Sequence, residues 1–497
     1  VAELLAEAVP CAEMSRFVKT GSEAAEAAVR IARSFTGRDM ILTCGYHCFD
    51  GETELLTPEG FRNVTSILPG DLVATLNPVS GFLEYRPATN AESHEFQGSL
   101  VHFKTSRVDL LVTPGHKVYR AFLDSHKRRT FRLVEAASMI GRAVVTMTAG
   151  AQWRGSEPNR IRIRSIRAYW PVGKKLTLSD VSQIREALDA GESTVELGKR
   201  FGVTRAMISH IRKRRKWSGI GQHTKGITDF PAESFMRFMG YFVTEGNILK
   251  STKRPRYEIF LHQKVGTAVF TAMQQVVAEL GFRSHIAGGK SISFGSKELW
   301  TWLHECGIGA GEKRIPLSLK AYGPRLLRPM FEAMVDGDGT RERGRPRKFY
   351  STSRQLVDDF CEIALKLGYT TTVTKRRNNE STINGKAVRS RLPIYHVSIS
   401  GEQIRTILRH QIFKRPSDGR VFCVSVPPHH LVYARRNGRS VWTGNSWHSW
   451  YAATKAKHPG VPAVMETLAR AFPYNDLDAL EGALKAHEGR VAAVMLE

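Results

Sequence analysis

The composition of this chain changes abruptly at two points, and this feature most restricts how it can fold. Residues 1–47 and 446–497 are rich in Ala and Glu at helical spacing, whereas the stretch between them combines short strand-like runs with basic segments. At 497 residues the chain is long enough to build several hydrophobic cores. The sequence therefore predicts a multidomain chain in which one protein interrupts another.

The net charge is strongly positive. The chain carries 73 Lys and Arg against 47 Asp and Glu, which gives a formal charge of +26. An excess of this size favours a polyanionic partner, so we expect double-stranded DNA to bind and no membrane to do so. The sequence shows neither an apolar run that could span a bilayer nor a secretory leader, which predicts a cytoplasmic protein.

The cysteines are scattered along the chain. They are Cys11, Cys44, Cys48, Cys306, Cys361 and Cys423. Zinc sites usually show short paired spacings, and disulfide scaffolds are dense in cysteine; neither pattern is present here. We therefore expect free thiols in a reducing compartment.

Two regions have the pattern of β structure. Residues 49 to about 149 alternate short apolar runs with Gly and Pro, which predicts an all-β unit. Residues 411–445 return to short β runs after a long central region. We expect segments 48–150 and 411–445 to belong to one domain, with the central region inserted into it.

Residues 174–217 have the spacing of a helix-turn-helix. Ile208 and Ile211 face inward on the last helix, which follows a turn at Gly202. Such a helix enters the major groove of DNA, and a basic tail contacts phosphates. The expected DNA contacts are Arg205, Ser209, Arg212, Lys213, Arg214, Arg215 and Lys216. A small three-helix linker with a solvated basic face is the alternative interpretation.

Cys48 and the Asn445-Ser446 pair stand at the two changes of composition, and their chemistry suits cutting and rejoining a chain. The Cys48 thiol can attack the carbonyl of His47 to form a thioester, which lacks the resonance stabilisation of an amide. The hydroxyl of Ser446 can accept the acyl group, and Asn445 can cleave its own peptide bond by cyclisation. An ester-to-amide shift would then ligate His47 to Ser446, releasing residues 48–445.

The context of these residues resembles inteins of the Hedgehog/intein (HINT) fold. The similar blocks are Cys48-Phe49-Asp50-Gly51-Glu52-Thr53, Thr113-Pro114-Gly115-His116, Val421-Phe422-Cys423-Val424-Ser425-Val426 with His430, and Trp442-Thr443-Gly444-Asn445-Ser446. The resemblance implies an all-β splicing domain that needs no cofactor. It implies that His116 protonates the leaving amide nitrogen of Cys48 while Thr113 polarises that amide. His430 would assist Asn445 or the branched intermediate.

The chain departs from the intein pattern at two positions. Gly444 stands where the family usually has His before the terminal Asn445, so assistance must come from elsewhere, and His430 is the candidate. Cys423 stands where the family often has Asp, and in some members such a Cys carries a branched intermediate itself. Because Cys48 is retained here, we assign Cys48 as the first nucleophile and Cys423 as an accessory that tunes its thiolate.

Residues 230–410 alternate helices and strands in two similar halves. Two segments resemble the LAGLIDADG motifs of homing endonucleases, namely Phe238-Met239-Gly240-Tyr241-Phe242-Val243-Thr244-Glu245-Gly246 and Phe331-Glu332-Ala333-Met334-Val335-Asp336-Gly337-Asp338-Gly339. The small residues Gly240 and Ala333 would let two helices approach closely. Glu245 and Asp338 would then lie side by side and hold Mg²⁺, which can activate water for phosphodiester cleavage. For either motif alone, an amphipathic helix with a chance acid is equally plausible.

Joining residue 47 to residue 446 gives Gly45-Tyr46-His47-Ser446-Trp447. With the upstream run Thr20-Gly21-Ser22-Glu23, this resembles class III pyridoxal-phosphate aminotransferases near the glutamate-1-semialdehyde aminomutase branch. The resemblance implies an α/β host that forms a homodimer when mature. It implies that Gly21 and Ser22 bind the phosphate of pyridoxal phosphate at a helix start, and that Tyr46 stacks on the pyridine ring. The expected host segments, 1–47 and 446–497, lack the region of the Schiff-base lysine, so the fragment alone is not expected to be active.

Two rivals to a self-splicing intein remain open. One is a sequence-specific DNA-binding protein in which the β flanks are a scaffold and the splicing and endonuclease sites are inactive. The other is an aminotransferase with a large insertion that is never removed. Glu245 stands where the family more often has Asp, which also leaves open an endonuclease that binds DNA without cutting it.

Overall fold

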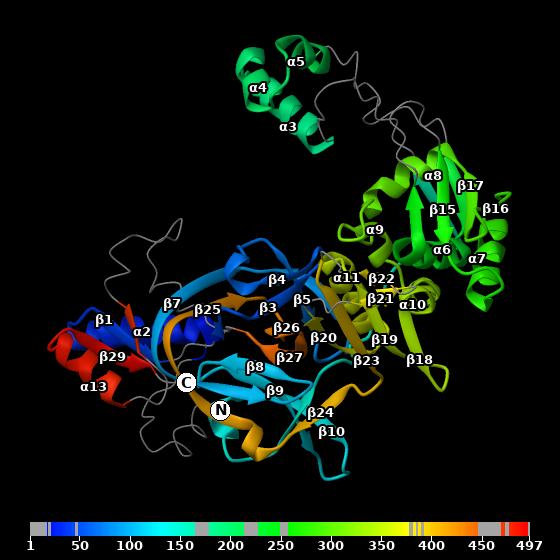
Figure 1. Ribbon diagram of the computed structural model, residues 1–497. Helices are drawn as coiled ribbons and strands as arrows, with labels where there is room; N and C mark the ends of the chain where they lie inside the picture. The colour runs from blue at the N-terminus through cyan, green and yellow to red at the C-terminus, as the bar shows by residue number, and fades with distance from the viewer. Residues whose placement is uncertain are drawn as a thin grey trace. The chain divides into compact units, whose positions relative to one another are not determined.

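In the computed structural model the chain forms two compact units (Figure 1). The described residues are 17, 21–44, 48–164, 178–212, 227–248, 257–376, 381–383, 386–388, 392–445, 469–472 and 477–495. One unit comprises residues 1–154, 364–374 and 397–497, and the other comprises 155–363 and 375–396. This division differs from the predicted endonuclease range 230–410, because residues 404–407 pair with 144–147 and Thr372 pairs with Arg439 in the first unit.

A closed barrel in the first unit joins strands from both predicted splicing segments. Its order is β2 (Phe49–Asp50), β25 (Ile412–Ser425), β7 (Asn90–Lys104) and β8 (Asp109–Val112). β7 and β25 are antiparallel and pair from Phe103↔Ile412 to Asn90↔Ser425. β2 lies between β25 and β8, through Phe49↔Phe422 and Phe49↔Val112. Segments far apart in the sequence therefore share one barrel, as the β patterns at the two ends predicted.

Further strands of the first unit complete its β structure. They are β3 (Glu54–Thr57), β4 (Gly60–Asn63), β5 (Leu72–Leu76), β6 (Leu83–Pro87), β9 (Lys117–Leu123), β10 (Arg129–Glu135), β11 (Val144–Met147), β20 (Thr370–Arg376), β24 (Ile404–Ile407), β26 (Leu431–Arg436) and β27 (Arg439–Gly444). Short 3₁₀ helices lie at Val64–Ser66, Ala137–Met139 and Arg409–Gln411. The core is aliphatic and aromatic and includes Phe49, Val101, Val112 and Val432, all almost fully buried.

The two ends of the chain form one small parallel sheet. β1 (Met40–Cys44) is central, between β28 (Ala469–Phe472) and β29 (Val491–Met495), and both pairings are parallel. Two helices belong to these segments, α2 (Gly21–Thr36) and α13 (Leu477–Ala486). The strand predicted at Met40–Leu42 is thus present as β1. The blue and red segments of Figure 1 lie together in this sheet, although the sequence separates β1 from β28 by the whole 48–445 stretch.

The second unit is built around two helices that pack closely. α6 (Ala232–Glu245) and α10 (Pro324–Asp338) meet at Gly240, where an added Cβ would overlap the carbonyl oxygen of Met330 and lie 2.7 Å from the Cβ of Ala333. The small residues at Gly240 and Ala333 therefore permit the close approach that the sequence predicted.

The remaining elements of the second unit are mixed helices and strands. A sheet has the order β14 (Gly246–Ile248), β15 (Glu258–His262), β17 (Ser291–Gly295) and β16 (His285–Ala287). The other elements are β12 (Arg160–Arg164), β13 (Ile227–Pro231), α7 (Ala268–Glu279), α8 (Lys297–Trp302), a 3₁₀ helix at Leu303–Cys306, α9 (Leu317–Lys320), β18 (Gly339–Glu342), β19 (Arg345–Ser351), β21 (Ser381–Ile383) and β22 (Lys386–Val388). α11 (Arg354–Lys366) and β23 (Ile394–Ser400) each contain residues of both units.

Three short helices lie within the predicted helix-turn-helix region. They are α3 (Leu178–Asp189), α4 (Thr194–Arg200) and α5 (Arg205–Arg212). Ile184, Leu197, Ile208 and Ile211 are fully buried and form their common core. The side chain of Ser193 caps α4 by accepting a hydrogen bond from the backbone of Val195. None of the described helices is both long and apolar enough to cross a membrane.

Candidate functional site

The backbone nitrogen of Cys48 is held by Thr113. The Cys48 N–H donates a 3.0 Å hydrogen bond to the hydroxyl oxygen of Thr113, and the N–H of Thr113 donates in turn to the Cys48 carbonyl at 3.1 Å. Both residues are almost completely buried. The nitrogen of Cys48 belongs to the peptide bond that would break, so Thr113 contacts the amide that it is predicted to polarise.

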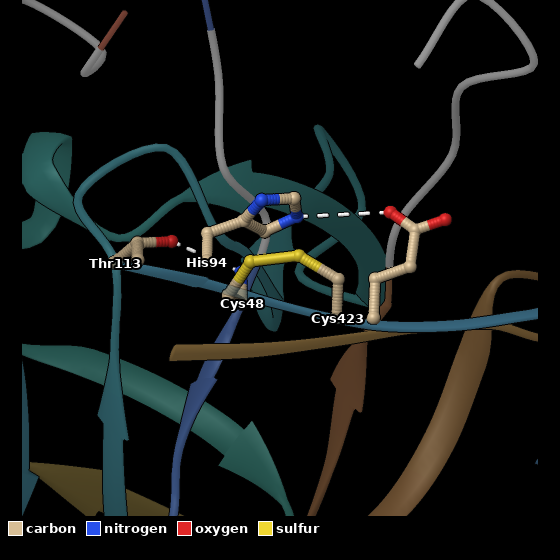
Figure 2. Close-up of a disulfide and its surroundings, with 5 residues drawn as sticks. Cys48, His94, Thr113 and Cys423 are labelled. Carbon is tan, nitrogen blue, oxygen red and sulfur yellow. Dashed lines mark hydrogen bonds and ion pairs between the residues drawn. A yellow bond between two sulfur atoms is a disulfide. The ribbon is translucent and has the colours of Figure 1, made fainter. Parts of the chain in front are cut away.

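The thiol of Cys48 lies against Cys423, and the two form a disulfide (Figure 2). Their Cα atoms are 4.4 Å apart across a sequence separation of 375 residues. This corrects the expectation of free thiols for these two cysteines. The scattered spacing gave no sign of the pair because the β2–β25 ladder, and not local sequence, brings them together. Cys306, by contrast, is a buried thiol outside any disulfide.

His116 is fully buried and contacts the downstream strand β27. A nitrogen of its ring, Nε2, is hydrogen-bonded to the hydroxyl of Thr443 at 2.9 Å. The ring of Phe49 meets the imidazole edge-on, with 4.7 Å between ring centres. The structure therefore places His116 between the first residues of the upstream segment and the last residues of the downstream one, with Thr443 as its hydrogen-bond partner.

His430 contacts Asn445 through its backbone. The N–H of Asn445 donates to the carbonyl oxygen of His430 at 3.1 Å, and Asn445 is 2 % exposed. His430 has a φ of 52°, in the left-handed region that non-glycine residues rarely adopt. This contact keeps Asn445, which is predicted to cyclise, beside the residue predicted to assist it, with the carbonyl of His430 as the contacting atom.

Gly444 has no room for a side chain. A Cβ at this position would overlap the carbonyl oxygen of Lys117 and lie 3.1 Å from Cδ2 of Leu133. The family's His cannot be accommodated on this backbone, which gives a physical reason for the departure noted in the sequence.

A buried ionic network that the sequence did not reveal supports the junction. Arg436 on β26 bonds Asp50 at 2.8 Å and Asp109 at 3.0 Å, and Asp109 is also bonded to His102 at 2.9 Å. Burial alone would raise the pKa of Asp109, but hydrogen bonds from His102 and Asn437 and the charge of Arg436 lower it. The network links β2, which follows Cys48, to β8, which leads to Thr113. No local pattern marks the role of Arg436, since Asp50 and Asp109 lie more than 300 positions away in the sequence.

In the second unit, Glu245 ends α6 and Asp338 ends α10, and both line a cavity of about 530 Å³. Burial raises the pKa of Glu245 to about 7, and the charge of Asp338 adds to the rise. Burial raises the pKa of Asp338 to about 6, although the charge of Lys313 opposes it. Two carboxylates in one cavity, each costly to ionise, fit a hard divalent cation that would supply the missing positive charge.

Lys313 lies in the same cavity. Its ammonium donates to the backbone carbonyls of Phe242 at 3.2 Å and Gly246 at 2.8 Å, beside the end of α6. Burial lowers the pKa of Lys313 to about 8. The structure thus places a positive charge next to the two acids.

The other predicted site residues are described only in part. Arg205 begins α5 and is exposed, Ser209 is half-buried on the same helix, and Arg212 ends it. Gly21 and Ser22 begin α2. The residues outside the described ranges are Tyr46, Lys213, Arg214, Arg215, Lys216 and Ser446.

Comparison with protein families gives a match to the LAGLIDADG-like domain over residues 326–411. The chain carries a LAGLIDADG-like domain. The matched range contains Asp338, so the acid at the end of α10 belongs to this domain.

Some curated relatives match most of the chain at low identity, and others match a short part of it at higher identity. A DNA-directed RNA polymerase subunit beta C-terminal section from Stigeoclonium helveticum is 21 % identical and covers 80 % of this chain, and an ATP-dependent Clp protease proteolytic subunit from Chlamydomonas moewusii is 23 % identical and covers 78 %. This chain spans 36 % of the length of each. A glutamate-1-semialdehyde 2,1-aminomutase from Methanothermobacter thermautotrophicus is 62 % identical over 75 residues, 15 % of this chain and 16 % of the relative.

Two solved structures also show local likeness. One is I-DmoI in complex with DNA and Mn, with a TM-score of 0.25 and 14 % identity, covering 34 % of this chain and 90 % of that one. The other is a class 3 split intein, AceL NrdHF, with a TM-score of 0.15 and 16 % identity, covering 18 % and 72 %. The LAGLIDADG-like domain and the aminomutase relatives support the predicted arrangement, an intein with an endonuclease inserted in an aminotransferase.

The raised pKa values of the cavity acids predict a pH-dependent stability. An acid whose pKa is higher in the folded than in the unfolded chain stabilises the fold while protonated, and this contribution is lost as pH rises from about 4.5 to about 7. We therefore expect Glu245→Gln to raise the melting temperature at about pH 8 and to change it little near pH 4.5. Glu258→Gln, outside the cavity, is the control. An equal change in melting temperature by Glu245→Gln at both pH values would contradict the raised pKa of Glu245.

The packing around Gly444 predicts that the family's histidine cannot be restored there. Gly444→His should lower the free energy of unfolding by roughly 1–3 kcal/mol or more, because the added side chain must displace backbone, and should not speed cleavage after Asn445. Urea denaturation and the rate of release of fragment 446–497 measure the two effects. Gly401→Ala, with open space around it, is the control. Faster cleavage at unchanged stability would show that the backbone accommodates the side chain.

Proposed function

We propose that this chain is a self-splicing precursor, in which residues 48–445 excise themselves and His47 is ligated to Ser446. The parallel sheet β28-β1-β29 is the observation that carries the proposal. Its central strand precedes Cys48 and both its partners follow Asn445, so the flanking segments form one structure across the intervening stretch. An insertion that leaves and returns at one place in a host domain has this property.

Cys48 and the residues that contact it carry out the first step, which is formation of a thioester. After a dithiol reductant has opened the Cys48–Cys423 disulfide and been oxidised itself, the Cys48 thiolate attacks the carbonyl of His47. The bond from that carbonyl to the Cys48 nitrogen breaks, and a thioester forms. The hydroxyl of Thr113 holds the amide nitrogen that leaves, and His116 supplies its proton after exchanging its bond to Thr443. The network around Arg436 keeps the strands that carry Cys48 and Thr113 in place.

The second half of the reaction takes place at the downstream junction. The hydroxyl of Ser446 receives the acyl group, and the side chain of Asn445 closes on its own carbonyl to break the chain. The buried contact between Asn445 and His430 excludes water and limits the rotation of the cyclising residue. The free amine of Ser446 then captures the acyl group from its own hydroxyl, which forms the final amide.

The relatives support an insertion shared by different hosts. Two proteins named for a polymerase and a protease each match about four-fifths of this chain, although they share no host activity. Aminomutase relatives match a much smaller part at higher identity. A mobile segment within an aminotransferase gene would produce this combination. In the mature host, Gly21 and Ser22 at the start of α2 would bind the phosphate of pyridoxal phosphate.

The second unit is proposed to cut DNA. Glu245 and Asp338 would hold Mg²⁺, which supplies an activated water and stabilises the leaving oxygen of the phosphodiester. Lys313 would place a positive charge beside the cleaved phosphate. The helices α3–α5 would add contacts in the major groove through the exposed face of α5, beginning at Arg205.

Intact-mass analysis of the reduced chain tests splicing. We expect a free 48–445 fragment and a ligated product of 1–47 with 446–497, because each junction carries its own nucleophile. Cys48→Ala and Asn445→Ala should each abolish the ligated product, while Cys306→Ser leaves it unchanged. A single unprocessed mass from the reduced wild-type chain would refute self-splicing. It would favour the alternative of a DNA-binding protein with inactive splicing and endonuclease sites.

A cleavage assay tests the endonuclease. Duplex DNA that joins the codons of His47 and Ser446 should be cut on both strands in the presence of Mg²⁺, and the activity should fall by more than about a thousandfold in Asp338→Asn. Affinity should decrease steeply with salt in both proteins, because the contacts are mainly to phosphates. Binding without nicking by the wild type would identify a decayed enzyme.

A further inference from the structure

Three arginines and a threonine form a row across the sheet β10-β9-β11-β24 of the first unit. Arg132 on β10 lies opposite Arg120 on β9. Thr146 on β11 lies opposite Arg120 on one side and Arg405 of β24 on the other. Residues directly opposite each other in antiparallel pairs project from the same face of a sheet, with Cβ atoms about 5 Å apart. We call these four residues the arginine row, because they present three positive charges along one line.

Polar atoms in the arginine row lack hydrogen-bond partners. Among the residues that the structure describes, none forms a hydrogen bond with Nε of Arg120, Oγ1 of Thr146 or Nε of Arg405. Thr146 is 1 % exposed, so bulk water does not reach its hydroxyl. Buried polar groups in native proteins almost always have a partner, because an unsatisfied group loses its hydration without compensation. All three atoms can donate a hydrogen bond, so the group that they lack is an acceptor.

Arg120 lies among other positive charges. Burial lowers the pKa of Arg120, and the charge of Arg142 lowers it further. The guanidinium of Arg120 is 4.4 Å from the ring centre of Phe122, and that of Arg132 is 5.9 Å from the same centre. Like charges that lie directly opposite on neighbouring strands destabilise a sheet. An anion bound between Arg120 and Arg132 would remove this repulsion.

Arg405 at the other end of the arginine row is only partly compensated. Its guanidinium forms an ion pair with Glu402, and Nη2 donates to the hydroxyl of Ser400 at 2.9 Å. The side chain of Glu402 is 67 % exposed, and water screens a carboxylate in that position. Burial and the charge of Arg107 lower the pKa of Arg405 despite this pair. The charge of Arg405 therefore remains available to a second anion.

We propose that the arginine row binds phosphate groups of double-stranded DNA, so that the first unit contacts DNA as well as the second. A phosphodiester carries one negative charge on two free oxygens, and guanidinium and hydroxyl groups are donors that proteins use to bind it. The formal charge of +26 favours a polyanion over a single free anion. Phosphate contacts carry no sequence information, so the row adds affinity without adding specificity.

The inference deepens the proposed function, because the DNA target is the one proposed for the endonuclease. The contact itself does not rest on cleavage. A row that binds phosphates holds any duplex, whether or not Glu245 and Asp338 cut it. Binding to DNA of unrelated sequence therefore separates the arginine row from the endonuclease.

Duplex binding at several salt concentrations tests the arginine row. The full chain carrying Cys48→Ala and Asn445→Ala, which prevents processing, is titrated with two duplexes, one that joins the host codons at the predicted junction and one of unrelated sequence. Adding Arg120→Gln and Arg132→Gln should weaken binding of both duplexes by about tenfold or more, because charge-assisted hydrogen bonds are lost. The slope of log affinity against log salt concentration should decrease in magnitude by about 0.9 for each arginine removed.

Arg86→Gln is the control, because Arg86 is an exposed arginine of the same unit that pairs with Glu84 at 2.7 Å. This change should alter neither the affinity nor the salt slope. Without DNA, the melting temperature of the Arg120→Gln and Arg132→Gln chain should stay the same or rise at low salt, because a like-charge pair is removed. An unchanged affinity or an unchanged salt slope in that chain would overturn the inference.

Protection from phenylglyoxal, which modifies arginine side chains, provides a measurement on the unsubstituted row. Either duplex should protect Arg120 and Arg132 but not Arg86, as mapped by peptide mass. Absence of protection would overturn the inference, and equal protection by inorganic phosphate would identify a free-anion site in place of a DNA contact. If the duplexes bind equally and neither is cut, the proposed endonuclease fails, while protection of the row upholds its contact with DNA. Cleavage of the junction duplex without protection gives the reverse result.

Discussion

The pairing of β7 with β25 is the interaction on which the candidate junction depends. Through β25 it supports β2, whose Phe49 lies between Phe422 and Val112. This arrangement places Cys48 against Thr113 on one side and Cys423 on the other. Because alternate residues of a strand point to opposite faces, a slip of one residue in the ladder would turn Cys423 away from Cys48. The pairing of β2 with β25 therefore sets the partner of the Cys48 sulfur, and its pairing with β8 sets the acceptor for the amide.

Buried charges have different roles in the two units. Around Arg436 each charge meets an opposite one within hydrogen-bond distance, so that removing one partner would leave a buried ion uncompensated. In the cavity at the ends of α6 and α10, burial raises the pKa of both Glu245 and Asp338, the charge of Asp338 raises that of Glu245 further, and the charge of Lys313 lowers that of Asp338. The first arrangement stabilises the orientation of strands. The second is less stable by itself and suits the binding of a cation.

The parallel sheet at the chain ends explains how a host could carry so large an insertion. β1 and β28 are neighbours in one sheet, so the intervening segment separates two strands that pair with each other. A domain inserted at such a place need not disturb the hydrogen bonds of its host. Residues near the two predicted junctions also lie together, since His116 is hydrogen-bonded to Thr443.

The sequence by itself determined the features that local patterns encode. Alternating runs predicted the β structure of residues 49–149, and small residues at Gly240 and Ala333 predicted close helix packing, because strand and helix periodicities are visible in short windows. The pairing of Cys48 with Cys423, the arginine row and the network of Arg436 were decided only by the tertiary structure. Each depends on which strands lie side by side, and residues hundreds of positions apart leave no local trace of that choice. The exclusion of a side chain at Gly444 has the same origin, since the atom that fills its space belongs to Lys117.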